Sequence, residues 1–252
     1  MCCDGRNNSM ISYAMISRSG GRKCNEDSIE MCSMDGNYVF ALADGLGGHG
    51  GGDEASACVT KEAIDVFRRK CDSCDYLTHA FENAQEWLLQ KKAQKGTKEE
   101  MKSTMVVLHI TEKQIRWAHI GDSRLYYFHR NHIVSRTLDH SVPQMLALGG
   151  QIKESEIRYH KDRNRVLRVM GTPWEGESYS VADPIETLDD QAFVLCSDGF
   201  WELITEKEME KTLKQSSSVA QWLEKMEKIV AKRGENKDMD NYSAICVYIA
   251  GE

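Results

Sequence analysis

The stretch at residues 104–137, TMVVLHITEKQIRWAHIGDSRLYYFHRNHIVSRT, decides the fold. It contains four runs rich in β-branched and aromatic residues, at Thr104–Ile110, Gln114–Ile120, Arg124–His129 and Ile133–Thr137. Only short connections of about three residues separate them. A parallel pair of strands needs a crossover of about a dozen residues, so these runs can pair only in antiparallel fashion.

Further strands and helices are predicted on both sides of this stretch. Apolar alternation predicts strands at Ile11–Ser17, Ser28–Ser33, Tyr38–Ala43, Phe193–Ser197 and Ala244–Ile249. Helical spacing predicts helices at Asp53–Lys70 (with Asp53 as N-cap), Asp75–Lys95, Glu206–Lys214 and Val219–Lys232. The strands outnumber those of a βαβ array. We therefore expect one α+β domain over residues 1–252, in which two antiparallel sheets pack face to face between flanking helices.

Composition excludes several classes of protein. The formal net charge of -7 argues against a general binder of nucleic acid or of an anionic membrane, since such proteins normally carry a basic face. No basic N-terminal segment leads into an apolar run, and no apolar run reaches transmembrane length. The nine cysteines are an odd number without framework spacing. We expect a cytoplasmic protein in a reducing compartment, with neither nucleic acid nor membrane as partner.

Cys71 and Cys74 form a lone C-x-x-C pair. Together with Cys2 and Cys3 they could make a zinc site or a redox pair. Zinc signatures consist of two spaced ligand pairs, so we favour four partly exposed thiols without a metal.

A glycine-rich stretch follows the strand predicted at Tyr38–Ala43, and it allows two interpretations. In FALADGLGGHGGGDEAS, residues 40–56, Gly45, Gly47 and Gly50 match the G-x-G-x-x-G fingerprint of dinucleotide-binding proteins. That fingerprint needs a parallel strand after its helix, whereas a second helix follows here. Asp44 would also repel a pyrophosphate. A P-loop fails because no Gly-Lys-Ser/Thr closes the run. The second interpretation is a metal site at Asp44.

Carboxylates recur at the ends of the predicted strands, as in Asp44-Gly45, Gly121-Asp122, Asp198-Gly199, Asp238-Met-Asp240 and Glu26-Asp27. Turn chemistry explains any single Asp-Gly pair. Several such carboxylates at one edge of a sandwich would repel one another unless a cation neutralised them. Oxygen-only clusters suit Mg²⁺ or Mn²⁺, and two such ions make a hydrolytic centre. Gly45 would let its backbone approach a cation, and Arg22, close to Glu26 in sequence, would bind phosphate.

These residues resemble a family, the metal-dependent Ser/Thr protein phosphatases known as PPM or type 2C protein phosphatases. The resemblance covers nearly the whole chain and looks like the bacterial branch. It rests on seven motifs in order: Arg22-x-x-Asn25-Glu26-Asp27, Asp44-Gly45-Leu46-Gly47-Gly48-His49, Ser103-Thr104, Gly121-Asp122-Ser123-Arg124, Asp139-His140-Ser141, Ser197-Asp198-Gly199 and Asp240-Asn241.

The resemblance implies a four-layer αββα sandwich with a dinuclear Mn²⁺ or Mg²⁺ centre that activates water. It implies that Asp44 bridges the metals, Gly45 offers its carbonyl, Asp198 and Asp240 bind one metal, and Glu26 holds the other mainly through water. Asp122, with Asp198, would hold a third and weaker ion. Arg22 would bind the phosphoryl oxygens, so that Arg22 and Asp44 are the catalytic residues. Residues 141–165 would form a mobile flap over the cleft.

The chain departs from the family pattern at several positions. Leu46 stands where animal-type members often carry a histidine proposed as general acid, and His49 is the bacterial-type histidine, for which we favour a structural role. Ser243 replaces a usual threonine and keeps the hydroxyl, and Lys102 replaces a frequent glycine.

The function expected from the sequence is hydrolysis of phosphoserine and phosphothreonine in proteins. The expected partners are phosphorylated proteins and a cognate Ser/Thr protein kinase, and the chain is expected to act as a monomer. One alternative is a non-catalytic regulator that binds phosphoproteins or a kinase on the same fold. Another is an enzyme acting on a small phosphorylated metabolite.

Overall fold

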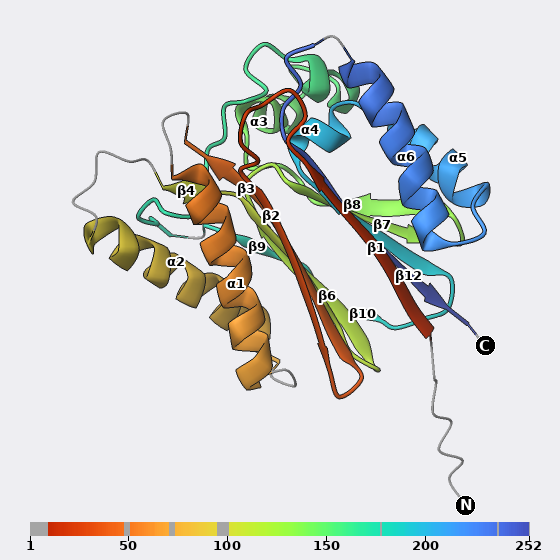
Figure 1. The fold of residues 1–252 in the computed structure, drawn as a ribbon, viewed down its shortest axis with the longest axis horizontal. Helices are drawn as coiled ribbons and strands as arrows, with labels where there is room; N and C mark the ends of the chain where they lie inside the picture. The colour runs from red at the N-terminus through yellow and green to blue at the C-terminus, as the bar shows by residue number, and fades with distance from the viewer. Residues whose placement is uncertain are drawn as a thin grey trace, which may run out of the picture.

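A computed structural model describes residues 10–47, 51–70, 74–94, 101–176, 178–235 and 237–251. Two antiparallel sheets form its centre (Figure 1). The first sheet has the order β1 (Met10–Arg18), β12 (Tyr242–Ala250), β11 (Gln191–Cys196), β7 (Arg124–His129), β8 (His132–Arg136). The second has the order β10 (Ile185–Glu186), β6 (Gln114–Ile120), β5 (Met105–Ile110), β3 (Asn37–Leu46), β2 (Asp27–Met34), with β4 (Lys102–Ser103) on β3 and β9 (Ser180–Val181) on β6.

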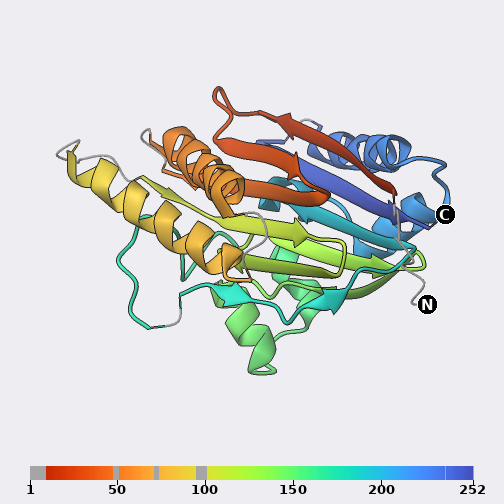
Figure 2. The same cartoon turned by 90° about the horizontal axis from the view of Figure 1, so that it is seen from below.

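Helices cover both outer faces of the sandwich. The long helices α1 (Gly52–Lys70) and α2 (Tyr76–Gln94) lie on one side, and α5 (Glu206–Lys214) and α6 (Val219–Gly234) lie on the other (Figures 1 and 2). The expected four-layer αββα arrangement is confirmed. None of the helices in the described ranges combines the length and the apolar character needed to traverse a lipid bilayer.

The period-two alternation of the central strands produces three separate apolar cores. In β3, Val39, Ala41 and Ala43 face the layer of α1 and α2, whereas Phe40 and Leu42 lie between the sheets. In β11 the same alternation sends one set of side chains toward α5 and α6 and the other between the sheets. Every residue of β11 is buried, as expected for a strand covered on both faces.

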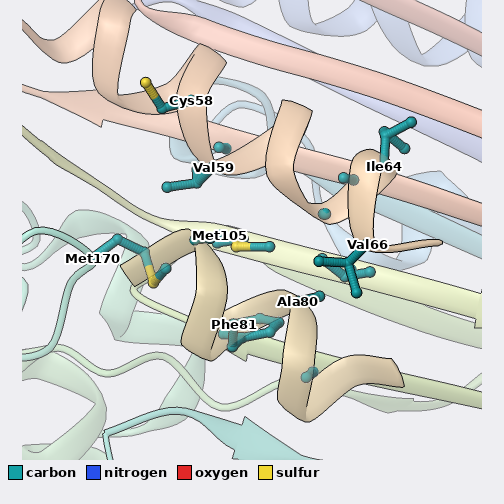
Figure 3. Packing of buried hydrophobic residues seen from close by; sticks show 14 of the residues in the cluster. Cys58, Val59, Ile64, Val66, Ala80, Phe81, Met105 and Met170 are labelled. Atoms are coloured by element: carbon teal, nitrogen blue, oxygen red, sulfur yellow. The ribbon is translucent and has the colours of Figure 1, made fainter. Parts of the chain in front are cut away.

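The outer core under α1 and α2 is shown in Figure 3. Val59, Val66 and Phe81 are almost fully buried, and they pack toward Met105 of β5. Met170, which ends the segment after the flap, joins the same cluster. The chain that follows residues 141–165 is therefore joined to this helical core at Met170.

Residues 141–165 belong to the long connection between β8 and β9. The segment contains α3 (Val142–Leu148), with Ser141 as N-cap, and a 3-10 helix, η1 (Glu154–Tyr159). Its two ends meet where Ser141 pairs with Val166.

The structure corrects three details of the predicted elements. Helix α1 begins at Gly52, so that Asp53 lies inside the first turn and is not the N-cap. The strand predicted from Thr104 begins at Met105, because the Thr104 backbone and hydroxyl bind Asp44 instead. The strand predicted at Phe193–Ser197 runs from Gln191 to Cys196, because Ser197 is the N-cap of the short helix α4 (Asp198–Trp201).

Candidate metal centre

All six predicted metal residues and Arg22 line one pocket of about 450 Å³ at the edge where the two sheets meet. The predicted residues in its lining are Arg22, Glu26, Asp44, Gly45, Asp122, Asp198 and Asp240. They come from segments up to 218 positions apart in sequence. The fold therefore brings together every residue of the proposed constellation.

Asp44 is held by its backbone in the interior of the pocket. Its N–H donates to Thr104 Oγ1 over 2.9 Å, and its carbonyl accepts from Thr104 N and from Ser103 Oγ, each at 2.9 Å. Thr104 Oγ1 is also 2.7 Å from Ser123 Oγ. The Ser103-Thr104 motif thus fixes the position of Asp44.

Gly45 is required by the close approach of two backbones. A Cβ at this position would lie 2.2 Å from the carbonyl oxygen of Gly52 and 2.7 Å from that of Glu26. The Gly45 N–H donates to the Glu26 carbonyl over 3.0 Å. No larger residue fits between β2 and the start of α1 without moving one of them.

Asp122 and Asp198 are connected through helix α4. Asp198 begins this helix, and Trp201 at its end donates its indole Nε1–H to the Asp122 carbonyl over 2.9 Å. Gly199 lets α4 approach the loop before β12, because a Cβ there would lie 2.2 Å from the Asn241 carbonyl oxygen.

Asn241 organises the loop that carries Arg22 and Glu26. Its Nδ2 donates to the carbonyls of Ser19 and Cys24, each at 2.9 Å, and its Oδ1 accepts from the Glu26 N–H at 2.8 Å. This role was not predicted, although Asn241 belongs to the last of the seven motifs.

Arg22 forms a planar fork on Asp240. Its Nε donates to Asp240 Oδ1 over 3.1 Å and its Nη2 to Oδ2 over 3.2 Å, while Nη1 reaches Asp238 Oδ2 at 3.4 Å. A predicted phosphate-binding residue and a predicted metal ligand therefore pair with each other here.

The pocket concentrates negative charge in a desolvated place. Burial raises the pKa of Asp44 well above its usual range, and the carboxylates of Asp27, Asp198, Asp122 and Asp240 raise it further. Burial followed by the Asp198 charge raises the pKa of Asp122, and burial followed by Asp240 raises that of Asp198 to about 6. Burial likewise raises the pKa of Glu26. Ionised carboxylates at these positions need a compensating cation.

The chemistry of these residues fits hard divalent cations, although the side-chain positions are not those of a closed cage. Across the described ranges, no three His, Cys, Asp or Glu side chains are arranged to hold a metal as they stand. Asp240 instead faces Arg22. The donor set nevertheless suits these ions, because carboxylate and carbonyl oxygens that share one pocket are the ligands Mg²⁺ and Mn²⁺ prefer.

The sequence interpretation assigned no role to Asp27, which lies beside the centre. It pairs with Asp44 across β2 and β3, and its Oδ2 accepts from Ser197 Oγ at 2.8 Å. Its buried Oδ1 has no hydrogen-bond partner among the described residues. Burial raises the pKa of Asp27 to about 7. The only sequence signal was its place after Glu26 in the first motif.

Other residues named from the sequence have mixed outcomes. Leu46 lines the pocket, so that no histidine occupies this place. His49, Cys2, Cys3 and Cys71 lie outside the described residues. Cys74 is a free and exposed thiol, and Cys24, not singled out earlier, lines the pocket.

Comparison with known proteins gives consistent results. The profile of the family Protein phosphatase 2C matches residues 17–242. The serine/threonine phosphatase stp of Listeria monocytogenes serotype 4b is 30% identical over 228 residues, which cover 85% of this chain and 86% of the relative. Protein phosphatase PhpP of Streptococcus pneumoniae is 28% identical over 216 residues, covering 84% and 86%.

Solved structures share the fold. Serine/threonine phosphatase Stp1 from Staphylococcus aureus superposes with a TM-score of 0.85 at 25% identity, covering 96% of each chain. The catalytic domain of the phosphatase PstP, solved with two manganese ions, has a TM-score of 0.81 at 22% identity and covers 96% of this chain and 100% of its own. With the family profile spanning all of the pocket residues named above, the chain belongs to the protein phosphatase 2C family and is a protein phosphatase of the bacterial PPM type.

Proposed function

We propose that this chain hydrolyses phosphoserine and phosphothreonine in proteins with the help of Mn²⁺ or Mg²⁺. The observation that carries the proposal is the single pocket in which five carboxylates, the Gly45 carbonyl and one arginine meet. Such a pocket can collect divalent cations and, through them and Arg22, a phosphoryl group.

The residues that would hold the metals follow from their places in the pocket and from the family resemblance. Asp44 would contact both main ions, with the Gly45 carbonyl beside it. Asp198 and Asp240 would hold one ion, and Glu26 the other through water. Asp122, joined to Asp198 through α4, would hold a third ion. When bound, such ions supply positive charge for the phosphoryl oxygens and lower the pKa of water in the site.

Arg22 would orient the phosphoryl group. Its side chain is 44% exposed, and it already presents a planar fork to two carboxylate oxygens of Asp240. Phosphoryl oxygens match the same fork. A substrate would thus take the place that the Asp240 carboxylate holds now, which also leaves Asp240 free for a metal.

Mn²⁺-dependent turnover is the test of this proposal. Purified protein is stripped with EDTA and assayed on phosphoserine and phosphothreonine peptides and on p-nitrophenyl phosphate, with and without added Mn²⁺. We expect activity on the peptides that chelator abolishes and Mn²⁺ restores. Full activity in excess chelator would contradict the metal proposal. Binding of phosphopeptides without turnover would favour the regulator, and preference for small phosphorylated metabolites would favour the third function.

Phosphorylated proteins would be the partners of this site, and a Ser/Thr kinase that makes them would be the opposing enzyme. Both remain proposals, as do action as a monomer, the single-domain organisation over 1–252 and the cytoplasmic location.

A further inference from the structure

Arg158 is a buried charge in the middle of the flap. It belongs to the 3-10 helix η1, and its side chain is 7% exposed. Its Nη1 donates to the carbonyls of Trp201 and Ile204, each at 2.6 Å, and its Nη2 donates to both carboxylate oxygens of Glu206 at 2.8 Å. The flap is therefore attached at its centre to the turn between α4 and α5.

The element that Arg158 binds carries part of the metal centre. Helix α4 begins with Asp198 and ends with Trp201, whose carbonyl Arg158 binds and whose indole donates to the Asp122 carbonyl. A cation at the C-terminal carbonyls of a helix also complements the helix dipole. Arg158 is therefore linked to the Asp122 backbone through one residue, Trp201, and it binds the end of the short helix that Asp198 begins.

A second arginine extends the same network from the other side. Arg124 follows Asp122 by two positions, lies 3.4 Å from the centre of the Trp201 ring, and binds both oxygens of buried Asp139 at 2.7–2.8 Å. The Tyr126 hydroxyl accepts a hydrogen bond from Arg124 Nη1 and donates one to Glu206 Oε1. Glu206 is also the carboxylate that Arg158 binds. Trp201 is thus held by three contacts: Arg124 on its ring, the Asp122 carbonyl at its indole N–H, and Arg158 at its own carbonyl.

The pocket of about 540 Å³ beside this network is not an anion site. Three arginines line it, Arg124, Arg136 and Arg158. Their guanidinium groups pair with Asp139, Glu154 and Glu206, so the charges are balanced. The network therefore points to positioning and not to a second ligand.

We propose that Arg158 is a positioning residue that couples the flap to the Asp122–Asp198 side of the metal centre through Trp201. Without Arg158, η1 loses its hydrogen bonds to the turn after α4, and the carbonyls of Trp201 and Ile204 lose their charged donor. Asp122 and Asp198 then sample positions less suited to metals. The expected change in kcat/KM rests on the proposed function. The expected change in Mn²⁺ affinity requires only that the pocket binds metal.

The test compares Arg158→Met with Arg233→Met. Arg233 serves as the control because it binds the same turn from α6, at the Leu203 carbonyl and at Glu208, and has no hydrogen bond to the described residues of 141–165; its side chain is more exposed, at 43%. For each variant we would measure Mn²⁺ affinity by calorimetry on the metal-free protein, the melting temperature without metal, and kcat/KM on a phosphopeptide. Residues behind metal ligands typically change affinity or activity by about 10- to 100-fold, and we expect a loss in this range for Arg158→Met alone.

The outcomes separate positioning from mere stability. If Arg158→Met leaves Mn²⁺ affinity unchanged, whatever its effect on the melting temperature, Arg158 is only a structural residue and the proposal is overturned. Arg158→Lys keeps a cation at the carbonyls, so the loss of Mn²⁺ affinity and of kcat/KM should be smaller than in Arg158→Met. It replaces the methionine variant if that one does not fold. If the parent protein shows no phosphatase activity, the proposed function fails, yet the calorimetric comparison still decides on Arg158.

Discussion

Arg22 and Asp240 show how one side chain can serve two partners in turn. The guanidinium of Arg22 donates to both carboxylate oxygens of Asp240. A metal bound to Asp240 would compete with Arg22 for the carboxylate oxygens. A phosphoryl group would then accept the hydrogen bonds of the Arg22 guanidinium. Arg22 therefore belongs to the substrate side of the site even though it contacts a candidate ligand.

Replacing Arg22 by alanine tests this assignment. Metal affinity should stay the same or rise, because a competitor for Asp240 is lost. By contrast, kcat/KM on phosphorylated substrates should fall roughly 30- to 150-fold, since a bidentate charge-assisted contact of about 2–3 kcal/mol disappears. Calorimetry and steady-state kinetics measure the two effects. Arg18→Ala, which removes an exposed arginine paired with Glu227, is the control. Weaker metal binding with unchanged kcat/KM would refute the role of Arg22.

Asp198 and Asp122 should differ in the size of their effects. Asp198→Asn removes a charge from a ligand of the main pair of ions and should lower kcat by several orders of magnitude. Asp122→Asn touches only the proposed third ion, so kcat should fall less and the affinity for the main pair should persist. Asp183→Asn, at an exposed position, serves as control. Equal loss of the main ions in both variants, measured by calorimetry, would show that Asp122 belongs to the main pair.

At the scale of elements, α4 depends on one glycine. A methyl group at Gly199 would meet the Asn241 carbonyl at 2.2 Å, and neither backbone can yield easily. We expect Gly199→Ala to cost roughly 1–3 kcal/mol of unfolding free energy, as overpacking does. At this chain length the melting temperature should fall by about 2–4 °C per kcal/mol.

Gly149→Ala provides the comparison for that measurement. Gly149 has φ of -77° and its nearest neighbour to a Cβ lies at 3.4 Å, so alanine fits there. Equal melting temperatures for the two variants would show that α4 can shift away from Asn241 at little cost.

The elements could be predicted where patterns are long enough. Helix α5 has the predicted bounds Glu206–Lys214, because Thr205 and Glu208 form a capping box before an amphipathic turn. Helix α4 was missed because four residues show no period. The start of α1 was misplaced because Gly52 packs against the Gly45 backbone. A Cβ at Gly52 would meet that backbone, and this tertiary contact leaves no local pattern in the sequence. Tertiary contacts, not propensity, set these boundaries.

The sequence predicted which residues form the site, but not the contacts between them. Asp-Gly pairs at strand ends indicated which carboxylates converge, since strand ends of packed sheets share an edge. The contacts of Asp27 with Ser197 and of Asn241 with the Arg22 loop could not be predicted, because they depend on which strands become neighbours. The fork of Arg22 on Asp240 likewise joins the two ends of the chain.

At the scale of the whole molecule, a stacked pair of imidazoles, buried His119 and half-buried His140, should make the fold sensitive to acid. His119 and His140 stack with ring centroids 4.7 Å apart, and His140 Nδ1 accepts from the Gly121 N–H. Burial, followed by His119 and Arg168, lowers the pKa of His140 to about 3, although Asp139 opposes this. The unfolded chain, with a pKa near 6.5, takes up a proton that the folded chain excludes.

Stability should therefore fall as the pH drops from about 6.5 toward 3. The contribution of His140 between pH 7 and pH 5 is at most about 2 kcal/mol. His140→Asn keeps an acceptor for Gly121 and should reduce this loss when urea unfolding is measured at both pH values. His132→Asn removes an exposed imidazole and is the control. The same pH slope in parent and His140→Asn would exclude His140 as a source of acid sensitivity.

Metals should stabilise the folded protein as well as activate it. A ligand that binds only the folded state at 100 times its Kd adds about 2.7 kcal/mol. The melting temperature should then rise by roughly 5–10 °C when Mn²⁺ is added to chelated protein. Asp44→Asn should abolish most of this rise. A rise that persists in Asp44→Asn would place the stabilising ions elsewhere on the molecule.

Strand β12 follows Asp240 and Asn241 directly, and it lies between β1 and β11, paired with both. During synthesis on a ribosome, this interior strand is among the last parts of the described chain to emerge. Until then β1 lacks its neighbour and the pocket lacks Asp240, Asn241 and the anchor of the Arg22 loop. A nascent chain interrupted before residue 240 thus lacks strand β12 of the first sheet, and its metal centre is not assembled. Premature termination should yield exposed strand edges for chaperones and proteases, and no partly active phosphatase.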